Sequence, residues 1–404
     1  MKKLSALVLA SSLLSGCSTI SGWFADEEEQ EIRQLKPIEA AFQPTISWQS
    51  SVGNGVDNYY SRLHPALAYD KLFVASRDGE IKALEPQTGK RLWQVQLEQD
   101  RESGWFDWFN AQYPSAKVAG GLVSAYDKVF VGTEDGYVYA LQQDSGEQVW
   151  RANVKGEVLS TPAVDSGYVV VLTGSGLLLA LDAESGEQKW SHETEVPPLS
   201  LRGLSAPVMV SGGVLSGTAT GKLMVNVVDN GLVAWEQAVA APTGATELER
   251  LADIDVTPLV VGGTVYVVSY DGTLAALELR SGRVVWKREY ASYLSLAYAG
   301  NSLFVVDTNS VVYALDRRNG IELWSQSGLR ERGLTAAATV GDYLVVGDQW
   351  GFMHWFSQQD GQIVARLDLG GDDEDEGIYT SPVVDGKVIY TQTRSGDVYA
   401  IETP

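Results

Sequence analysis

Few residues in this chain carry the side chains from which catalytic or metal sites are built. Among 404 residues there is one cysteine, Cys17, and there are three histidines, His64, His192 and His354. A single cysteine excludes an intramolecular disulfide, a cysteine-based zinc site and a Cys-x-x-Cys-His haem attachment. The histidines lie in unrelated parts of the chain, without the spacing of a metal site or a catalytic triad. These residues therefore predict no catalytic site, no metal site and no cofactor.

The densest acidic run is Asp372-Asp373-Glu374-Asp375-Glu376. Carboxylates of this kind could bind calcium, but the run lacks the alternating ligand spacing and the internal glycine of a calcium loop. We interpret it as a solvated loop, with loose calcium binding as the alternative.

Cys17 follows a short apolar segment. Two lysines, an apolar run over Leu4–Leu14 and small residues before Cys17 form the pattern of a secretory signal peptide, too short to cross roughly 30 Å of hydrocarbon. Leu14-Ser15-Gly16-Cys17 resembles the bacterial lipobox. The resemblance implies cleavage before Cys17 and its diacylation, and Ser18 in place of aspartate favours the outer membrane. The alternative is that Cys17 is an ordinary residue of a cleaved signal peptide.

These features divide the N-terminal part of the chain. We expect a lipoprotein signal peptide over residues 1–16 and a lipidated, flexible tether over residues 17–44, which carries the acidic run Asp26–Glu29 and little periodic apolar character. The formal charge of the chain is −22, and loss of Lys2 and Lys3 with the signal peptide would give −22 − 2 = −24. Such a charge opposes binding to the phosphate backbone, so we expect no nucleic-acid partner.

An internal repeat organises the rest of the chain. A turn residue recurs at intervals between 38 and 57 residues, at Gly79, Gly136, Gly176, Gly221, Gly272, Ser310, Gly351 and Gly396. A second glycine lies four residues before a tryptophan in six copies, at Gly89/Trp93, Gly146/Trp150, Gly186/Trp190, Gly231/Trp235, Gly282/Trp286 and Gly320/Trp324. Each copy has four short apolar runs separated by turn residues, which is the pattern of a four-stranded propeller blade.

The repeat predicts an all-β fold over residues 45–404, an eight-bladed β-propeller of four-stranded antiparallel blades. The eighth copy ends without a tryptophan strand, whereas Ile46-Ser47-Trp48 is such a strand without a blade. We expect this N-terminal strand to complete the last blade, which leaves no open sheet edge at the seam. A linear solenoid, the alternative, would leave both edges open.

The tryptophans are expected to be structural. At one position in every blade, an indole ring can fill the wedge between neighbouring sheets and donate its N–H to a carbonyl. This set comprises Trp48, Trp93, Trp150, Trp190, Trp235, Trp286 and Trp324. Ala365 occupies the tryptophan position of the seventh copy, and Asn309-Ser310 replaces Asp-Gly at the sixth turn. We therefore expect less regular packing in these two blades.

The unit Ala-Leu-Asp-x-x-x-Gly-x-x-x-Trp, as in Ala180 to Trp190, resembles the repeat of pyrroloquinoline-quinone dehydrogenases. That resemblance leaves two functions open, a quinone-dependent periplasmic dehydrogenase and a non-catalytic relative that keeps only the propeller. Many such dehydrogenases have an adjacent cysteine pair over the quinone, and this chain has none.

Two segments outside the repeat carry a closer resemblance. Pro198-Leu199-Ser200-Leu201-Arg202-Gly203-Leu204-Ser205-Ala206-Pro207 and the run from Thr243 to Pro258 are similar to the BamB family of outer membrane protein assembly factors. The resemblance implies a non-enzymatic scaffold lipoprotein of the β-barrel assembly (BAM) complex. It would be lipid-anchored in the outer membrane, face the periplasm, and dock on the POTRA domains of BamA. The family's docking residues fall on Leu199, Leu201, Arg202, Asp253 and Asp255.

The two segments precede the first strands of consecutive blades, so we expect them to lie side by side on one rim. Leu199 and Leu201 are two residues apart and would face the same way beside Arg202, a plausible hot spot for a partner. The leucines could instead be core residues, and the aspartates could touch the partner or only orient Arg202. An aromatic insertion, Gly104–Phe109, is either a contact site or a lid on its own propeller. Direct contact with unfolded outer membrane proteins is left open.

Overall fold

The computed structural model describes residues 32–56, 59, 61–98, 115–201, 203–241, 243, 245–246, 248–370 and 376–404. The chain divides into two compact units, Met1–Pro37 and Ile38–Pro404, and every described strand belongs to the second. The predicted signal peptide, Cys17, the aromatic insertion, Arg202 and Asp372–Asp375 lie outside the described residues. Within the described ranges, no helix has the length and apolar character needed to span a membrane.

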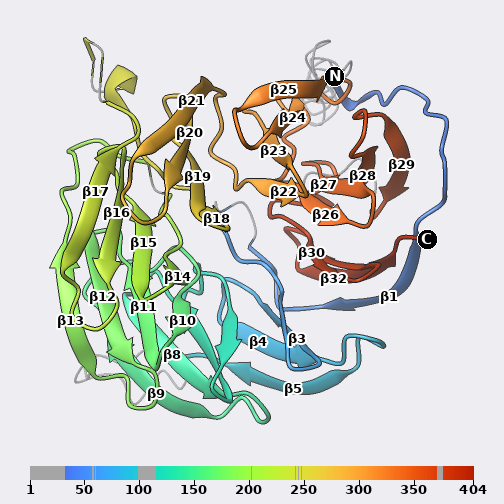
Figure 1. Ribbon diagram of the computed structural model, residues 1–404. Helices are drawn as coiled ribbons and strands as arrows, with labels where there is room; N and C mark the ends of the chain where they lie inside the picture. The colour runs from blue at the N-terminus through green and yellow to red at the C-terminus, as the bar shows by residue number, and fades with distance from the viewer. Residues whose placement is uncertain are drawn as a thin grey trace, which may run out of the picture. The chain divides into compact units, whose positions relative to one another are not determined.

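Residues 38–404 form a ring of eight four-stranded antiparallel sheets, which confirms the predicted all-β propeller (Figure 1). Blades 1 to 4 consist of β2 (Ala66–Ala68), β3 (Lys71–Ala75), β4 (Glu80–Leu84) and β5 (Arg91–Gln96); β6 (Val123–Ala125), β7 (Lys128–Gly132), β8 (Tyr137–Gln142) and β9 (Gln148–Asn153); β10 (Ala163–Asp165), β11 (Tyr168–Leu172), β12 (Leu177–Asp182) and β13 (Gln188–Glu193); and β14 (Val208–Val210), β15 (Gly213–Gly217), β16 (Lys222–Val227) and β17 (Val233–Ala238).

Blades 5 to 8 follow the same order from the inside of the ring outward. They consist of β18 (Leu259–Val261), β19 (Thr264–Val268), β20 (Thr273–Glu278) and β21 (Val284–Glu289); β22 (Ala297–Ala299), β23 (Ser302–Val306), β24 (Val312–Asp316) and β25 (Ile321–Gln326); β26 (Ala338–Val340), β27 (Tyr343–Gly347), β28 (Phe352–Ser357) and β29 (Ile363–Asp368); and β30 (Val383–Asp385), β31 (Val388–Gln392), β32 (Asp397–Glu402) and β1 (Thr45–Ser51). A 3₁₀ turn, Leu248–Arg250, lies before β18.

The ring closes at the predicted seam. β1 pairs antiparallel with β32, from Thr45 opposite Glu402 to Ser51 opposite Asp397. Blade 8 therefore takes its outermost strand from the start of the ring, and the solenoid alternative is wrong. Because blade 8 contains both ends of the repeat array, the backbone hydrogen bonds between β1 and β32 hold the last blade to the strand that leads into blade 1.

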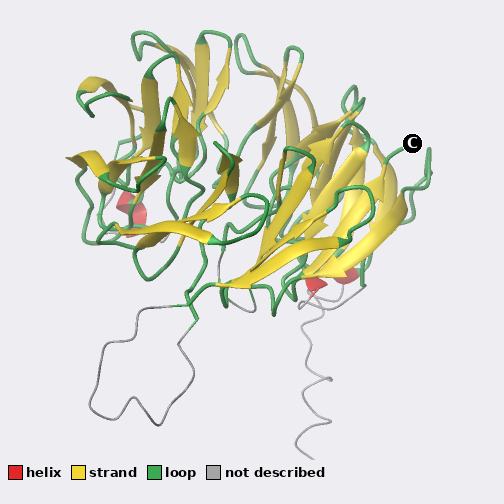
Figure 2. Ribbon diagram, turned by 90° about the horizontal axis from the view of Figure 1, so that it is seen from below, coloured by secondary structure: helices red, strands yellow, loops and turns green. Residues whose placement is uncertain are grey.

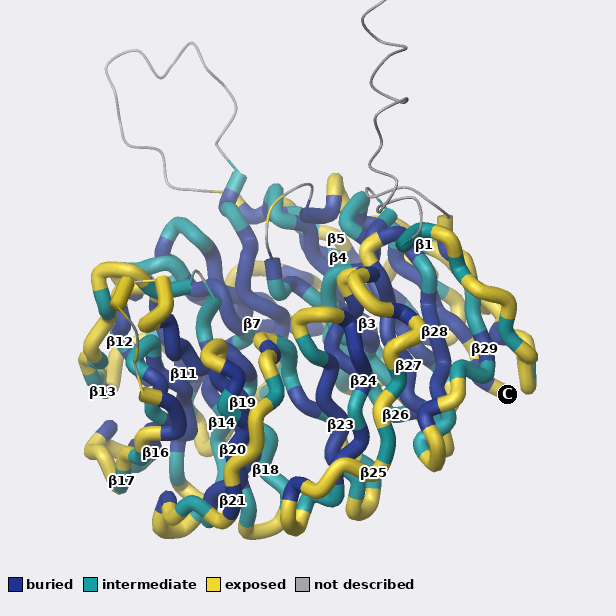
Figure 3. Tube along the Cα trace, turned by 90° about the horizontal axis from the view of Figure 1, so that it is seen from above, coloured by how far each residue is buried: buried dark blue, intermediate teal, exposed yellow. Residues whose placement is uncertain are grey.

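The sequence pattern of each strand follows its place in the blade. The two middle strands have neighbours on both faces and read as continuous apolar runs, as in β12, whose four central residues Leu178–Leu181 are all buried. The outermost strands alternate, as in β13, where Trp190 is buried between exposed neighbours. Figures 2 and 3 show this arrangement, with the loops at the two ends of the blades and the buried trace concentrated in the middle strands.

The recurring tryptophan and glycine form one contact that joins consecutive blades. All seven predicted tryptophans donate their indole N–H to a backbone carbonyl of the next blade, over 2.6–3.1 Å, as predicted. Each ring also lies against the glycine of the next blade's outer turn. A Cβ on that glycine would come within 2.5–2.9 Å of the indole, as for Gly186 against Trp150. The glycine therefore recurs in each outer turn because the indole ring of the preceding blade leaves no room for a side chain at that position.

In blade 7 the tryptophan and the small residue opposite it are exchanged between the two strands. Ala365 lies directly opposite Trp355 on β28, whereas in six other blades the tryptophan of the outermost strand lies opposite a small residue on the middle strand. Trp355 is fully buried and donates its indole N–H to Thr403 Oγ1 in blade 8, at 3.0 Å. Phe42, ahead of β1, packs on Trp355 and Tyr343. The prediction of irregular packing in blade 7 is wrong.

Blade 6 keeps its turn without a glycine. Ser310 adopts φ 63°, a left-handed conformation that favours glycine. Asp307 Oδ1 accepts the backbone N–H groups of Asn309 and Val311 at 2.9 and 2.8 Å, so the aspartate side chain fixes the turn. The strands of this blade pair as in the others, and the expected irregularity is absent here too.

Candidate functional site

Two long loops on the same end of the ring hold the predicted site residues. Residues 194–207 connect β13 to β14, and residues 239–258 connect β17 to β18. Asp253 Oδ1 accepts the backbone N–H of Leu201 at 3.0 Å, and Ser205 Oγ donates to the Val256 carbonyl at 2.8 Å. The prediction that the two segments lie side by side is confirmed.

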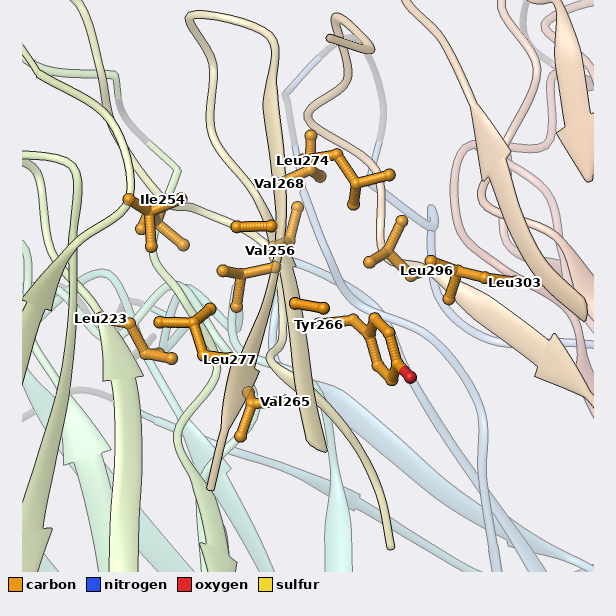
Figure 4. Close-up of a cluster of buried hydrophobic side chains, with 14 of the residues drawn as sticks. Leu223, Ile254, Val256, Val265, Tyr266, Val268, Leu274, Leu277, Leu296 and Leu303 are labelled. Carbon is orange, nitrogen blue, oxygen red and sulfur yellow. The ribbon is translucent and has the colours of Figure 1, made fainter. Parts of the chain in front are cut away.

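The 239–258 loop is anchored to the core around both aspartates. Ile254 and Val256 are buried in a cluster with Leu223 and Leu277 of blades 4 and 5 (Figure 4). The Asp253 carbonyl accepts the Tyr270 N–H at 2.9 Å, and the Ile254 N–H donates to the Thr218 carbonyl at 3.1 Å. The buried side chains of Ile254 and Val256 alternate with the two aspartates along the loop and thus fix the backbone that carries them.

The site residues differ sharply in exposure. Leu199 is 43% exposed, so it is not a core residue, and Leu201 is half-buried. Asp253 and Asp255 are only 2% and 7% exposed. The leucines are therefore accessible from outside, whereas both carboxylates lie beneath the loop. Arg202, which follows Leu201 and belongs to the predicted patch, is outside the described residues.

Burial shapes the electrostatics of the two carboxylates. It raises the pKa of Asp253, against the opposing effect of the hydrogen bond from Leu201. Burial raises the pKa of Asp255 to about 7; the Arg62 charge opposes this shift and the nearby Asp253 adds to it. Asp253 Oδ2 is buried and has no hydrogen-bond partner among the described residues. The site therefore holds acidic groups in a setting that disfavours their charge.

Arg62 is a site residue that the sequence did not reveal. Its Nη1 donates to the carbonyl of Leu204 at 3.2 Å and to the carbonyl of Asp255. Arg62 comes from the segment between β1 and β2, whose blue trace in Figure 1 crosses the middle of the ring toward β18. This arginine therefore ties both loops to blade 1 on the far side of the axis. It lies outside the repeat, so nothing in its sequence context signals the contact.

A pocket of about 180 Å³ opens between the two loops. Leu201, Leu204 and Ile254 contribute apolar lining, and Asp255 is a further lining residue. A Cβ on Gly203 would lie 2.2 Å from Asp255 Oδ2, so only glycine fits above this carboxylate. The pocket has the size and lining to receive one side chain of a partner.

The three histidines form no common site. His354 is buried in blade 7, where its Nε2 lies 2.9 Å from Asp348 Oδ2, an oxygen that also accepts from Arg332 at 2.7 Å. Burial lowers the pKa of His354. Within the part of the chain that the structure describes, no three His, Cys, Asp or Glu side chains are grouped to hold a metal ion.

The repeat region matches a family model described as outer membrane protein assembly factor BamB, over residues 77–326. The chain is 55% identical to the BamB of Alteromonas naphthalenivorans over 393 residues, covering 96% of this chain and 94% of that one. It is 40% identical to the BamB of Escherichia coli strain K12 over 395 residues, covering 98% and 97%. The chain belongs to the BamB family.

A solved BamB structure has the same fold. The crystal structure of BamB from Moraxella catarrhalis superposes with a TM-score of 0.77 at 27% identity, covering 89% of this chain and all of that one. The family assignment thus agrees with the closer of the two resemblances predicted from sequence.

The dehydrogenase likeness is confined to the fold. A quinohemoprotein alcohol dehydrogenase from Pseudomonas putida HK5 superposes with a TM-score of 0.66 at 12% identity, covering 92% of this chain and 78% of that one. A pocket of about 490 Å³ lies where the blades meet, and its described lining contains no carboxylate. That lining offers no carboxylate ligand for a metal ion such as calcium.

Proposed function

We propose that this protein is a non-catalytic scaffold lipoprotein of the BAM complex that docks on the periplasmic POTRA domains of BamA and assists the insertion of outer membrane proteins. Membership of the BamB family supports the assignment to the complex. The observation that carries the docking site is the exposed Leu199 on a loop whose backbone is held by the buried Asp253.

The proposed contact surface consists of Leu199, Leu201 and Arg202. Apolar anchors beside an arginine are the composition of an energetic hot spot, and a preorganised loop binds with a smaller loss of conformational freedom. A partner side chain would enter the pocket beside Leu201. Asp253 and Asp255 act from below as positioning residues, because their burial leaves little surface for a direct contact.

The proposed anchor is the acylated Cys17, in the inner leaflet of the outer membrane, with the propeller facing the periplasm. Two ester-linked chains and one amide-linked chain would hold the protein firmly, unlike a single myristoyl group. The lipobox-like segment before Cys17 supports this anchor.

The experiment that tests the proposal is affinity purification from native membranes. The full chain carries a C-terminal tag, the membranes are solubilised in mild detergent, and co-purifying proteins are identified by mass spectrometry. Recovery of BamA with wild type, and its loss with Leu199→Glu, is expected. Recovery of the tagged protein without BamA, or with a quinone chromophore, would overturn the proposal.

A further inference from the structure

The docking surface formed by Leu199, Leu201 and Arg202 is small for a stable complex. Specific protein–protein interfaces bury about 800 Å² on each partner, from roughly 20 to 30 residues. Residues of one short loop supply only part of such an area, so a partner that binds there has to contact further parts of the propeller. Exposed apolar side chains on the same end of the ring indicate where those contacts lie.

Two large apolar side chains are exposed next to this loop, on the side of blade 5. Leu248, in the loop before β18, is 69% exposed, and Tyr270, in the turn between β19 and β20, is 39% exposed. Because the four strands of a blade alternate in direction, the turn between the two middle strands lies on the same end as the loops between blades. On that end, the fully described loops 154–162 and 327–337 have no exposed large apolar side chain. The exposed groups therefore do not recur with every blade, as parts of the repeat would.

The buried Asp253 links the loop of Leu199 to both of these residues. Its side chain accepts the Leu201 N–H at 3.0 Å, and its backbone carbonyl accepts the Tyr270 N–H at 2.9 Å. Leu248 lies five positions before it in the same loop. The three exposed side chains, on three consecutive connections of the rim, are thus held in place relative to one another through one interior residue.

A capping box holds the turn that presents Leu248. Glu249 Oε2 accepts the backbone N–H groups of Ala245 and Thr246 at 2.8 and 3.0 Å, and Thr246 Oγ1 accepts the Glu249 N–H at 3.3 Å. This reciprocal pair is the usual start of a helix, but only the 3₁₀ turn Leu248–Arg250 follows, the short coil above β17 in Figure 1. These bonds fix an apolar side chain in solvent, and fixing it in advance lowers the entropy cost of binding.

We propose that the docking surface continues across blade 5, where Leu248 and Tyr270 contact the same partner as Leu199, the periplasmic region of BamA. This inference rests on the proposed function and adds two contact residues to it. Leu248 inserts an apolar side chain into a recess of the partner, and Tyr270 offers an aromatic ring. Thr246 is a positioning residue, because it acts through the turn that carries Leu248. The partner is accordingly apolar at two separate places, opposite Leu199 and opposite Leu248.

The test is the affinity of the full chain for full-length BamA, both in detergent, by isothermal titration calorimetry. We expect Leu248→Glu and Tyr270→Ser each to weaken binding about tenfold. Leu232→Glu is the matched control, because this leucine is 66% exposed but lies on the opposite end of blade 4, and it should bind as wild type does. If Leu199→Glu weakened binding while neither blade 5 variant did, this inference would be wrong and the proposed function would stand. If wild type did not bind BamA, both would be wrong.

A second set of variants tests the role of Thr246. Thr246→Val removes the Oγ1 acceptor and should weaken binding about fivefold, whereas Thr246→Ser keeps the acceptor and should bind as wild type does. The double variant Thr246→Val/Leu248→Ala should bind no more weakly than Leu248→Ala alone, because the threonine acts through the leucine. Thermal unfolding checks that each variant keeps its fold. Additive losses in the double variant would show that the turn does not present Leu248 to the partner, and would contradict the proposal.

Discussion

Asp253 Oδ1 accepts the backbone N–H of Leu201 at 3.0 Å, across 52 positions of sequence and between the loops of two consecutive blades. Asp253 is buried, whereas Leu199, two positions before Leu201, is 43% exposed. An interior carboxylate of one blade thus sets the conformation of an exposed apolar segment of its neighbour.

Removing this acceptor should loosen the contact surface without unfolding the ring. We expect Asp253→Ala to weaken binding to the BamA periplasmic region about tenfold, since the Leu201 N–H loses its partner and the leucines lose their fixed position. Asp253→Asn keeps an oxygen in place and is the matched control. Isothermal titration calorimetry measures both; equal affinities for the alanine and asparagine variants would contradict this role.

A charge at Leu199 should weaken docking while leaving stability nearly unchanged. Leu199→Glu is expected to cost roughly 1–3 kcal/mol of binding free energy and to change the free energy of unfolding by less than about 0.5 kcal/mol. Leu232→Glu, at a leucine that is 66% exposed just before β17, is the control and should bind normally. If both variants bound equally well, Leu199 would not belong to the interface.

Asp255 should make the protein less stable as pH rises. Burial raises the pKa of Asp255 to about 7 in the folded protein, from 3.8 for an aspartate in the unfolded chain, so the folded state binds the proton more tightly than the unfolded state. Stability from this group is fully present below about pH 4, falls between pH 4 and 7, and is constant above. We expect Asp255→Asn to remove this dependence, so that the variant gains on the order of 2–4 kcal/mol relative to wild type between pH 4 and 8. Urea unfolding across that range measures it, and parallel curves would show that Asp255 is already ionised at pH 5.

The exchanged pair in blade 7 predicts a rescue. Trp355→Ala should cost about 3–5 kcal/mol of unfolding free energy, because it empties the wedge between blades 7 and 8. Adding Ala365→Trp restores the arrangement of the other blades and should recover at least about 1 kcal/mol. Denaturant unfolding of the two single variants and the double variant gives the coupling; strict additivity would mean that the two positions do not share one space.

The fold could be predicted because the same pattern of turn residues, apolar runs and tryptophan recurs along the chain. The glycine before each tryptophan marks the same turn in six copies, and Trp48 near the start lacks a blade, so the number of blades and the seam followed from spacing alone. The packing of blade 7 could not be predicted in this way, because Trp355 and Ala365 are opposite each other in space but ten positions apart in sequence. The spacing of residues along one strand does not show that a tryptophan and a small residue have been exchanged between two strands.

The site could be predicted only in part. The position of two irregular segments before consecutive blades indicated that the segments carrying Leu201 and Asp253 would lie side by side. The burial of Asp253 could not be predicted, because it depends on Ile254 and Val256 entering the core from a long loop. Arg62 could not be predicted either, since its contacts with Leu204 and Asp255 lie 142 and 193 positions away, on the opposite side of the ring.

Site-specific cross-linking tests the docking claim most directly. Cys17 is the only cysteine in the chain, and its acylation would leave the thiol unreactive, so Leu199→Cys or Leu232→Cys supplies a single thiol for a photoactivatable reagent in native membranes. The account predicts a cross-link to the periplasmic region of BamA from position 199 and none from position 232. Cross-linking from 232 but not from 199 would place the interface on the outer strands and contradict the account.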